Sequence, residues 1–356
     1  MEKLKKILLT IGDITIKGGA ERVVVNLANA FVEYGYDVEI LSFYKGGSKE
    51  SYVLDSKVKL KFLNTTSMDN KRKSLMYRLF YKIYESYWLN KHYKDKDFII
   101  FNNSPHYPLF KCEKTHYVKI MHTASNGRYL GRYNFFDALV LVSSKELEFW
   151  QRHHKNVRTI SNFLPSIPKE RTDYKQKVVL SVGRMTDNDE KGFKRLIEIW
   201  NLVCKQYKDW KLCIVGEGES RDEIVAKIKE YQLEDCVILE NFTDKISEKY
   251  LSSSVYAMTS YAEGLPMVLL EASSYGLPCV SFDIKTGPRD IIEHQKSGFL
   301  ITDEDLQEYA RQLEQLMESE SLREKMGEYA KQRVAKKFSK EAIMQEWEKF
   351  LGFLKI

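Results

Sequence analysis

The chain lacks any run approaching the ~18 consecutive apolar residues that a membrane-spanning helix requires. Low-complexity segments are also absent, and no repeat is evident beyond an alternation of strand and helix patterns. The segment 1–11 begins with basic residues, but its apolar run is short and no small-residue cleavage site follows it. We therefore expect a first β-strand here rather than a signal peptide, and no membrane-spanning helix.

The chain contains few cysteines, and they do not occur in closely spaced pairs. The five cysteines are odd in number and widely spread, and no C-x2-C pair occurs. This spacing argues against a disulfide framework and a zinc site of the usual kind, and it favours a reducing cytoplasmic setting.

The size and charge of the chain indicate two dissimilar domains. A chain of 356 residues suits two cores of ~150–200 residues each. Residues 1–170 contain 28 Lys/Arg and 17 Asp/Glu, a net charge of +11, whereas the remainder contains 28 and 33, a net charge of −5. The basic half predicts an anionic partner for the first domain.

Short β-branched runs alternate with amphipathic stretches along the whole chain, which predicts an α/β fold. Two doubly wound, Rossmann-like domains facing across a cleft are expected, with ligands at the carboxyl ends of the strands. The polar segment Asn162–Lys177, with its two prolines, is the predicted linker. Expected strands are Lys6–Ile11, Val38–Ser42, Phe98–Asn102, Tyr117–Met121, Ala138–Val142, Val178–Val182, Lys211–Val215, Val237–Leu239, Val255–Thr259, Pro278–Phe282 and Gly298–Ile301. Expected helices include Ala20–Tyr34, Leu75–Asn90, Lys145–Arg152, Asp305–Glu318, Ser321–Lys337 and Lys340–Leu354.

Two carboxylates flank a predicted loop-to-helix junction. Glu263 precedes Pro266, which suits the first helical position, and Glu271 lies about one and a half turns inside the helix. The free N–H groups of the first turn favour an anion between them. This arrangement suits a sugar nucleotide, although an isolated pair of this kind more often consists of a solvated loop residue and an outward-facing helix residue.

Glycines follow two predicted strands. Gly18 and Gly19 precede the first helix, where they would allow a phosphate to approach the backbone; a plain strand–helix turn explains them equally well. Gly216 occupies a similar position in the second half. The absence of G-x-G-x-x-G disfavours a nicotinamide dinucleotide site.

Charged side chains also follow predicted strands. Arg184 and Lys191 flank one loop and could clamp a diphosphate without a metal. The D-x-D sequence Asp187-Asn188-Asp189 lies in the same loop, but its strongly charged, exposed setting does not favour a metal site. His122 follows a strand and is either a structural residue or part of a site.

The segment Lys71–Lys96 interleaves basic and aromatic residues at helical spacing. It predicts either an interfacial helix on anionic lipid or a core helix with a solvated basic edge. RNA binding is a third reading, but no RNA-recognition motif accompanies it.

Taken in order, these motifs resemble those of the retaining, GT-B-fold glycosyltransferases of family 4, which include enzymes of lipid-linked oligosaccharide, capsule and O-antigen synthesis. The resemblance covers essentially the whole chain. The matching segments are Gly18-Gly19-Ala20-Glu21, His122, Gly183-Arg184 with Lys191-Gly192, Val215-Gly216-Glu217-Gly218, Ser260–Pro266, Glu271-Ala272 and Tyr275–Pro278.

The resemblance implies domain boundaries at 1–165 for an acceptor- and membrane-facing domain and at 166–338 for a nucleotide-sugar-binding domain. A last helix in 339–356 would cross back to the first domain. Arg184 and Lys191 would hold the donor diphosphate and act in catalysis.

The remaining roles also come from the resemblance. The backbone at Gly18, Gly19 and Gly216 would approach the donor. Glu271 would bind the ribose, and His122 would act in catalysis beside the transferred sugar.

Glu263 has two implied roles, in catalysis and in substrate binding. Together with the amides of Gly264 and Leu265 it would contact the donor sugar.

The expected activity is retaining transfer of a hexose from a nucleotide sugar to a lipid-linked or surface-polysaccharide acceptor, by metal-independent front-face substitution. The expected donors are UDP-Gal, UDP-GalNAc, UDP-Glc or UDP-GlcNAc, with no cofactor and no nucleic-acid partner. The basic first domain would hold the protein on the cytoplasmic face of the anionic plasma membrane. A sugar-nucleotide epimerase and a non-catalytic nucleotide-sugar-binding subunit are the alternatives.

Overall fold

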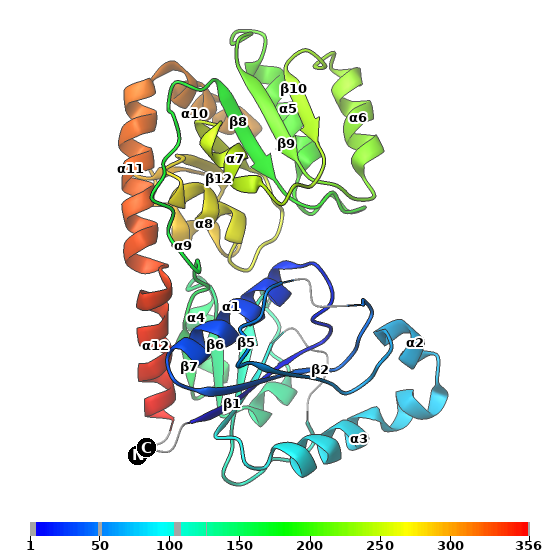
Figure 1. The fold of residues 1–356 in the computed structure, drawn as a ribbon. Helices are drawn as coiled ribbons and strands as arrows, with labels where there is room; N and C mark the ends of the chain where they lie inside the picture. Colours follow the sequence, from blue (N-terminus) through cyan, green and yellow to red (C-terminus); the bar gives the residue numbers. More distant parts are fainter. Residues whose placement is uncertain (1–4, 49–51, 103–107, 126, 355–356) are drawn as a thin grey trace. The chain divides into compact units, whose positions relative to one another are not determined.

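The chain divides into two compact units (Figure 1). The computed structural model describes residues 5–48, 52–102, 108–125 and 127–354, apart from the side chains of Arg72 and Arg78. Unit 1 comprises Met1–Pro165 together with Lys340–Ile356, and unit 2 comprises Ser166–Ser339. Each unit contains one parallel sheet with helices, which confirms the predicted α/β class with two doubly wound sheets.

The described part of unit 1 contains seven parallel strands in the order β3-β2-β1-β4-β5-β6-β7. The central strands consist mainly of apolar residues and are almost entirely buried, as parallel sheets covered on both faces require. The elements of unit 1 are β1 (Lys6–Ile11), α1 (Gly19–Glu33), β2 (Asp37–Ser42), β3 (Lys59–Phe62), α2 (Met68–Arg72), α3 (Leu75–Tyr93), β4 (Phe98–Phe101), β5 (His116–Met121), η1 (Gly131–Phe135), β6 (Ala138–Leu141), α4 (Leu147–His153), β7 (Val157–Thr159) and α12 (Lys340–Phe353).

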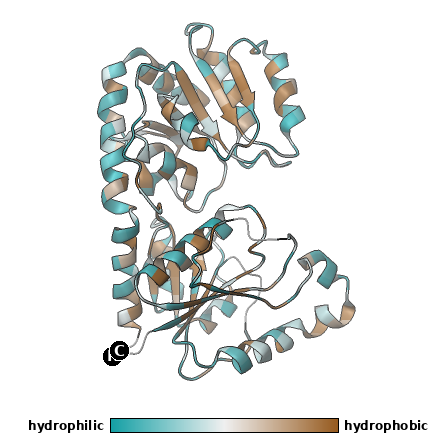
Figure 2. Ribbon diagram, viewed as in Figure 1, coloured by the Kyte–Doolittle hydropathy of each residue, from teal (hydrophilic) through white to brown (hydrophobic). Residues whose placement is uncertain are grey.

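The described part of unit 2 contains six parallel strands in the order β10-β9-β8-β11-β12-β13. Figure 2 shows hydrophobic colouring along these strands, which matches their burial beneath the helices. The elements are β8 (Val178–Val182), α5 (Phe193–Val203), β9 (Lys211–Val215), α6 (Arg221–Glu230), β10 (Val237–Glu240), α7 (Ile246–Leu251), β11 (Val255–Met258), α8 (Met267–Ser274), β12 (Cys279–Phe282), α9 (Pro288–Ile291), β13 (Gly298–Ile301), α10 (Leu306–Glu318) and α11 (Glu320–Lys337).

The last helix, α12, belongs to unit 1 although its sequence follows unit 2. The ring of Trp347 packs edge-on against Phe31 of α1, with 5.7 Å between the ring centroids. Lys340 forms an ion pair with Glu33 at 2.6 Å. A buried aromatic contact and a charge pair therefore hold the chain's end against α1.

Each strand predicted from the sequence is present to within one residue at either end. The strands β3 and β7, the helix α2 and the 3₁₀ turn η1 were not predicted. The strand β3 has the sequence KLKF, and its exposed lysines are typical of an edge strand that avoids further pairing, so its apolar signal is weak. No helix in the described parts of the chain is long and apolar enough to cross a membrane.

Candidate functional site

The order of strands in unit 2 identifies one edge of its sheet as the candidate site. The strand order of unit 2 reverses at the β8–β11 pair, with β9 and β10 on one side and β12 and β13 on the other. In open parallel sheets, ligands bind outside the carboxyl ends of the strands at such a reversal. The loop after β8 is 183–192, and the loop after β11 is 259–266. These loops contain Arg184, Lys191 and Glu263.

Lys191 and Glu263 form the centre of this site. The ammonium group of Lys191 lies 2.7 Å from Oε1 of Glu263, and the two side chains are 26% and 10% exposed. The hydroxyl of Ser260 donates to the same carboxylate oxygen at 2.7 Å. The side chain of Lys191 passes directly beside the backbone of Gly183. A Cβ atom at position 183 would lie 2.9 Å from Cγ of Lys191 and would collide with it. The structure thus brings together two residues that the sequence analysis placed in separate motifs.

Arg195 binds the loop that carries Glu263. This residue could not be recognised from the loop motifs of the sequence. Its Nε donates to the carbonyl of Thr259 at 2.5 Å, and Nη2 donates to the carbonyl of Ser260 at 2.6 Å. Its guanidinium lies 3.8 Å from the ring centroid of Tyr261 and forms an ion pair with Asp303 at 2.9 Å. Arg195 is 4% exposed and its two hydrogen bonds to these carbonyls are buried, whereas Tyr261 and Asp303 reach the surface.

The sequence did contain a signal for this arginine. Arg195 stands in α5 among the apolar residues Phe193, Leu196 and Ile197, which are all buried. A charge inside such a helix must find hydrogen-bond partners, so its presence indicates a polar network.

Gly192 holds Lys191 close to the loop after β11. Its φ of +68° is in the left-handed region, and a Cβ atom would lie only 1.9 Å from the carbonyl oxygen of Thr259. In return, the hydroxyl of Thr259 donates to the carbonyl of Gly192 at 2.8 Å. Only glycine fits this contact between the two loops.

The Asp187-Asn188-Asp189 sequence has a structural role at the start of α5. The carboxylate of Asp189 accepts the backbone N–H groups of Phe193 at 2.9 Å and Lys194 at 3.1 Å. Burial raises the pKa of Asp189 above its ordinary value. Asp187 is exposed. Within the described residues, no group of three or more His, Cys, Asp or Glu side chains is arranged to hold a metal ion.

The Glu263–Glu271 segment adopts the predicted loop-to-helix junction with one correction. Helix α8 begins at Met267, so Pro266 is the N-cap rather than the first helical residue. Gly287 packs against this turn, because a Cβ atom there would lie 2.6 Å from Cδ of Pro266 and 2.9 Å from the carbonyl of Gly264. The hydroxyl of Thr286 also donates to the carbonyl of Glu263.

Glu271 points inward, so the alternative of an outward-facing helix residue is wrong. Its side chain is buried at 8% exposure and accepts a hydrogen bond from the hydroxyl of Tyr250 at 2.9 Å. Leu265, in the preceding turn, is buried at 6% exposure. Burial of a carboxylate costs free energy unless it is well hydrogen-bonded, and such positions are often functional.

Arg184 and Gly216 lie at the ends of β8 and β9. Arg184 is exposed near the start of the loop 183–192, which also contains Lys191. A Cβ atom at Gly216 would lie 1.9 Å from the carbonyl oxygen of Gly183. Gly216 therefore has a packing function, which is to let the two loops meet.

The glycines of unit 1 open its first helix. Gly18 is the N-cap of α1 and Gly19 is its first residue. A Cβ atom at Gly19 would meet nothing within 4 Å, so the space beside this backbone is open. The preceding loop is held by Asp13, whose carboxylate accepts the backbone N–H of Gly46 at 2.6 Å and of Thr15 at 2.9 Å.

His122 lies at the end of β5 in a network with Asn102. The amide nitrogen of Asn102 donates to the carbonyl of Ile100 at 3.3 Å, which turns its Oδ1 toward Nε2 of His122, 3.0 Å away. With this assignment Nε2 carries the proton and Nδ1 is an acceptor. Desolvation, together with the charge of Lys119, lowers the pKa of His122 to about 3, so the ring is neutral at physiological pH.

This neutral histidine makes stability depend on pH. The unfolded chain binds a proton at His122 below pH ~6.5, whereas the folded chain does not, so the unfolding free energy falls as pH decreases from ~6.5 toward 3. Between pH 7.5 and pH 5.5, we expect the free energy of unfolding to decrease by about 1 kcal/mol less in His122→Gln than in the wild type. The free energies are measured by urea unfolding at each pH. His153→Gln, at an exposed position, is the control. Equal losses in all three proteins would contradict the assignment.

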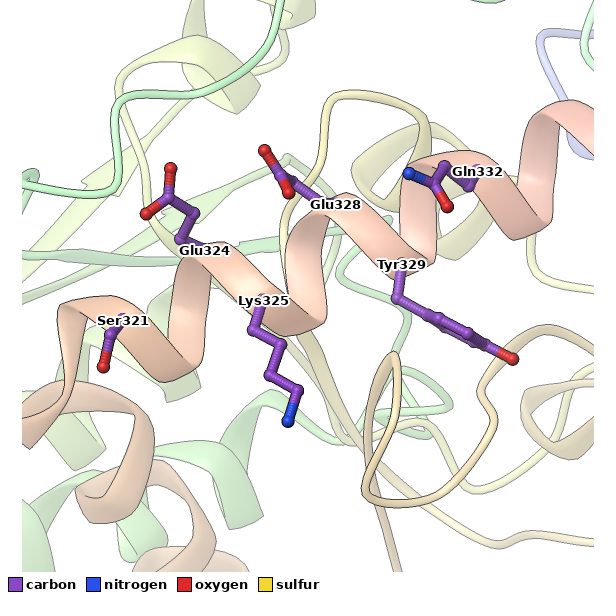
Figure 3. A pocket seen from close by; sticks show the side chains of 6 residues that line it. All are labelled: Ser321, Glu324, Lys325, Glu328, Tyr329 and Gln332. Atoms are coloured by element: carbon purple, nitrogen blue, oxygen red, sulfur yellow. The ribbon is translucent and has the colours of Figure 1, made fainter.

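A surface hollow on α11 is unrelated to these residues (Figure 3). Figure 3 shows Glu324 and Glu328 pointing to one side of the helix, and Lys325 and Tyr329 to the other. Glu328 forms an ion pair with Arg171 at 2.6 Å. Because the side chains do not converge, this hollow lacks the features of a binding site.

The two parallel sheets with their helices form an α/β fold of the GT-B type, which solved glycosyltransferase structures share, and comparison with known proteins gives the family. The model for glycosyl transferases group 1 matches residues 164–333. Amylovoran biosynthesis glycosyltransferase AmsD of Erwinia amylovora is 33% identical over 370 residues, covering 98% of this chain and 99% of that protein. An uncharacterized glycosyltransferase of Haemophilus influenzae is 30% identical over 359 residues, covering 98% and 100%. The chain belongs to the group 1 glycosyltransferase family.

More distant relatives and solved structures extend this comparison. An α-1,4-N-acetyl-D-galactosaminyltransferase of Campylobacter jejuni, named for a glycan on diphospho-undecaprenol, is 28% identical, covering 100% of this chain and 99% of that protein. A variant of S. aureus TarM in complex with fondaparinux, α-GlcNAc-glycerol and UDP has a TM-score of 0.81 at 18% identity, covering 98% and 100% of the two chains. Anabaena HepE in complex with UDP and glucose has a TM-score of 0.75 at 18% identity, covering 98% and 99%. These structures share the fold.

Proposed function

We propose that this glycosyltransferase moves a hexose from a UDP-sugar to a lipid-linked or surface-polysaccharide acceptor, with retention of configuration and without a metal. The observation that carries the proposal is the Lys191–Glu263 pair at the carboxyl ends of β8 and β11, in a chain of this family. UDP-Gal, UDP-GalNAc, UDP-Glc and UDP-GlcNAc are the proposed donors. The UDP in the TarM and HepE complexes supports this choice of nucleotide.

The proposed acceptor follows from two full-length relatives. AmsD acts in amylovoran biosynthesis, and the Campylobacter enzyme is named for an undecaprenol-diphosphate-linked glycan. Both names refer to the synthesis of bacterial glycans, so we propose an acceptor of the same chemical class for this chain.

Lys191 is the proposed partner of the donor diphosphate. Its side chain is 26% exposed, so an anion can reach it, and its present partner Glu263 is oriented by Ser260. When a diphosphate binds, the ammonium can turn to it, and Glu263 becomes an acceptor for sugar hydroxyls beside the amides of Gly264 and Leu265. Arg184, exposed at the other end of the loop, supplies the second positive charge.

The other proposed contacts lie around this centre. Buried Glu271 accepts the ribose hydroxyls, and the backbone at Gly216 approaches the nucleotide. The backbone at Gly18 and Gly19 of unit 1 is a further proposed contact for the donor phosphates, and open space lies beside Gly19. The neutral His122 offers Nδ1 as an acceptor to a hydroxyl of the transferred sugar.

The proposed chemistry depends on stabilising the leaving group. Cleavage at the anomeric carbon creates oxocarbenium character and releases a nucleoside diphosphate. Positive charge from Arg184 and Lys191, already placed before reaction, lowers the free energy of that transition state. A donor phosphate oxygen takes the proton of the acceptor hydroxyl as it attacks from the same face, which gives retention. The use of Asp189 as a helix cap supports the metal-independent mechanism.

A thermal-shift panel with UDP, GDP, ADP and NAD, each with a chelator, tests the donor site. We expect UDP at about a hundred times its dissociation constant to stabilise unit 2 by ~2.7 kcal/mol, and the other nucleotides to have little effect. A GDP response would redirect the donor to mannose or fucose. No response to any nucleotide would refute the proposed site, and stabilisation by UDP that disappears with chelator would refute the metal-independent clamp.

Retention is tested separately by the configuration of the product. We expect the new glycosidic bond formed from an α-linked UDP-sugar to be α, as determined by the anomeric proton coupling in an NMR spectrum of the product. A β-linked product would require an inverting mechanism and would exclude front-face substitution.

We further propose that unit 1 binds the anionic cytoplasmic face of the plasma membrane. Residues 1–170 carry a net charge of +11, and two of their lysines, Lys82 and Lys91, lie on α3. Each cation near an anionic surface contributes ~1 kcal/mol to binding. A protein with a lipid-linked acceptor would gain from this location, because enzyme and acceptor would share one surface.

A further inference from the structure

Helix α3 packs on unit 1 with only one part of its surface. Near its C-terminal end Ser86, Leu89 and Tyr93 are buried, at 1%, 2% and 0% exposure. The hydroxyl of Tyr77 lies 3.0 Å from that of Tyr44, which is outside the helix, and donates to the buried carboxylate of Glu85 at 2.8 Å. These contacts fix the orientation of the helix, and they leave a different face uncovered.

The uncovered face of α3 is apolar. Its residues recur at spacings of three and four and therefore share one side of the helix. They form what we call the α3 apolar stripe: Met76, Leu79, Phe80, Ile83, Tyr84 and Tyr87, which are 48–67% exposed. In Figure 2 hydrophobic patches recur along this helix. The alternative of a core helix with a solvated basic edge is therefore wrong for most of α3, since its large apolar residues face outward.

A second segment extends the stripe. The backbone N–H of Leu109 donates to the hydroxyl of Ser86 at 2.8 Å, and Sγ of Cys112 donates to Oδ1 of Asn90 at 3.1 Å. These two bonds hold residues 109–112 along the edge of α3. Leu109 is 54% exposed and Phe110 is 42% exposed, so both add to the uncovered apolar surface.

The exposed charged side chains of α3 are positive. Lys82 and Lys91 on the helix and Lys73 just before it are exposed. The single acidic residue in the sequence of the helix is Glu85, which is buried. An apolar face bordered by cations and aromatic rings complements an anionic lipid surface, where the rings and the aliphatic lysine stems lie at the boundary of the headgroups.

We propose that the α3 apolar stripe, with Leu109 and Phe110, inserts into the interface of an anionic lipid bilayer. This inference rests on the proposed membrane binding of unit 1 and specifies its form. Binding by charge alone disappears when salt screens it, whereas inserted side chains provide an apolar contribution that salt does not remove.

Co-sedimentation with lipid vesicles tests this proposal. The full-length protein is mixed with vesicles of equal parts phosphatidylglycerol and phosphatidylcholine, in ~0.1 M and ~1 M salt, where the screening length falls from ~10 Å to ~3 Å. We expect the wild type to retain measurable binding in high salt. We expect Phe80→Ser/Ile83→Ser to lower the partition coefficient at least about tenfold in both salts, since two large apolar side chains no longer leave water.

Two further variants separate the contributions. Lys73→Glu/Lys82→Glu should weaken binding in low salt and change it little in high salt. Leu202→Ser/Ile238→Ser removes apolar side chains of 41% and 43% exposure from unit 2 and should bind like the wild type. Circular dichroism melting curves establish that each variant folds, and UDP-induced thermal shifts report separately on the donor site.

Three results would overturn the insertion. The first is a partition coefficient of the Phe80→Ser/Ile83→Ser protein equal to that of the wild type. Another is complete loss of wild-type binding in high salt, which would leave only the electrostatic docking. The third is a wild-type dimer in sedimentation velocity without lipid that this double variant converts to a monomer, because the stripe would then bind a second copy. A loss of glycosyl transfer to a water-soluble acceptor would concern the proposed function and not the insertion.

Discussion

Replacement of Lys191 by methionine is expected to lower kcat/KM for glycosyl transfer by about a hundred- to a thousandfold. The substitution removes the charge that neutralises the donor diphosphate. It also leaves the carboxylate of Glu263, whose side chain is 10% exposed, without its cation, so a negative charge then faces the incoming anion. The rate is measured as release of UDP from a saturating series of UDP-sugars.

Lys194→Met is the matched control for this loss. Lys194 lies in the first turn of α5, but its side chain pairs with Glu223 at the surface, so its removal should change the rate little. Lys191→Met/Glu263→Gln should recover part of the donor affinity, because the unpaired carboxylate is gone. If Lys191→Met keeps its kcat/KM within about threefold of the wild type, the diphosphate assignment is wrong.

Arg195→Met is expected to destabilise unit 2 strongly. The carbonyls of Thr259 and Ser260 would lose their buried donor, at about 1–3 kcal/mol for each, and the stacking on Tyr261 would be weakened. We expect a total loss of roughly 3 kcal/mol and a decrease in Tm of about 10 °C, measured by differential scanning calorimetry. Arg311→Met removes an arginine whose side chain is 69% exposed on α10 and should leave Tm unchanged.

Arg195→Lys separates positioning of the site from stability. Lysine keeps the positive charge but lacks the planar fork that reaches two carbonyls at once. The loop before Glu263 should therefore lose its fixed geometry, so that KM for the donor rises severalfold while most of the stability remains. An Arg195→Lys protein with wild-type donor KM and an unchanged UDP-induced thermal shift would restrict Arg195 to a structural role.

Much of the fold could be predicted because its signals are local. A buried parallel strand such as Val178–Val182 is an apolar run of strand length between polar turns, and its bounds were predicted as they occur. Helix α10 was predicted to within one residue. Its N-terminus has a local signal, because the side chain of Asp305 accepts the backbone N–H of Glu308. The short strand β7, at the sheet edge, carried too few apolar residues to give such a signal.

The site was only partly predictable for a related reason. Loops that follow strands could be recognised from glycine and charge, and this located Lys191, Glu263 and Glu271 near the carboxyl ends of a sheet. Their partners could not be recognised, because Arg195 bonds the carbonyl of a residue 64 positions away. Likewise, the D-x-D sequence gave no indication that Asp189 would cap α5.

The sequence by itself determined the class of the protein: its alternating apolar runs specify two parallel sheets, and its ordered loop motifs specify the family. These properties depend on residues that are close together in the chain. Only the tertiary structure decided that Lys191 pairs with Glu263, 72 positions away, and that the apolar face of α3 is left uncovered. Both depend on which strands become neighbours and which helix face the sheet covers. The strand neighbours and the buried helix faces are selected by the packing free energy of the whole core. A local sequence pattern does not specify that free energy.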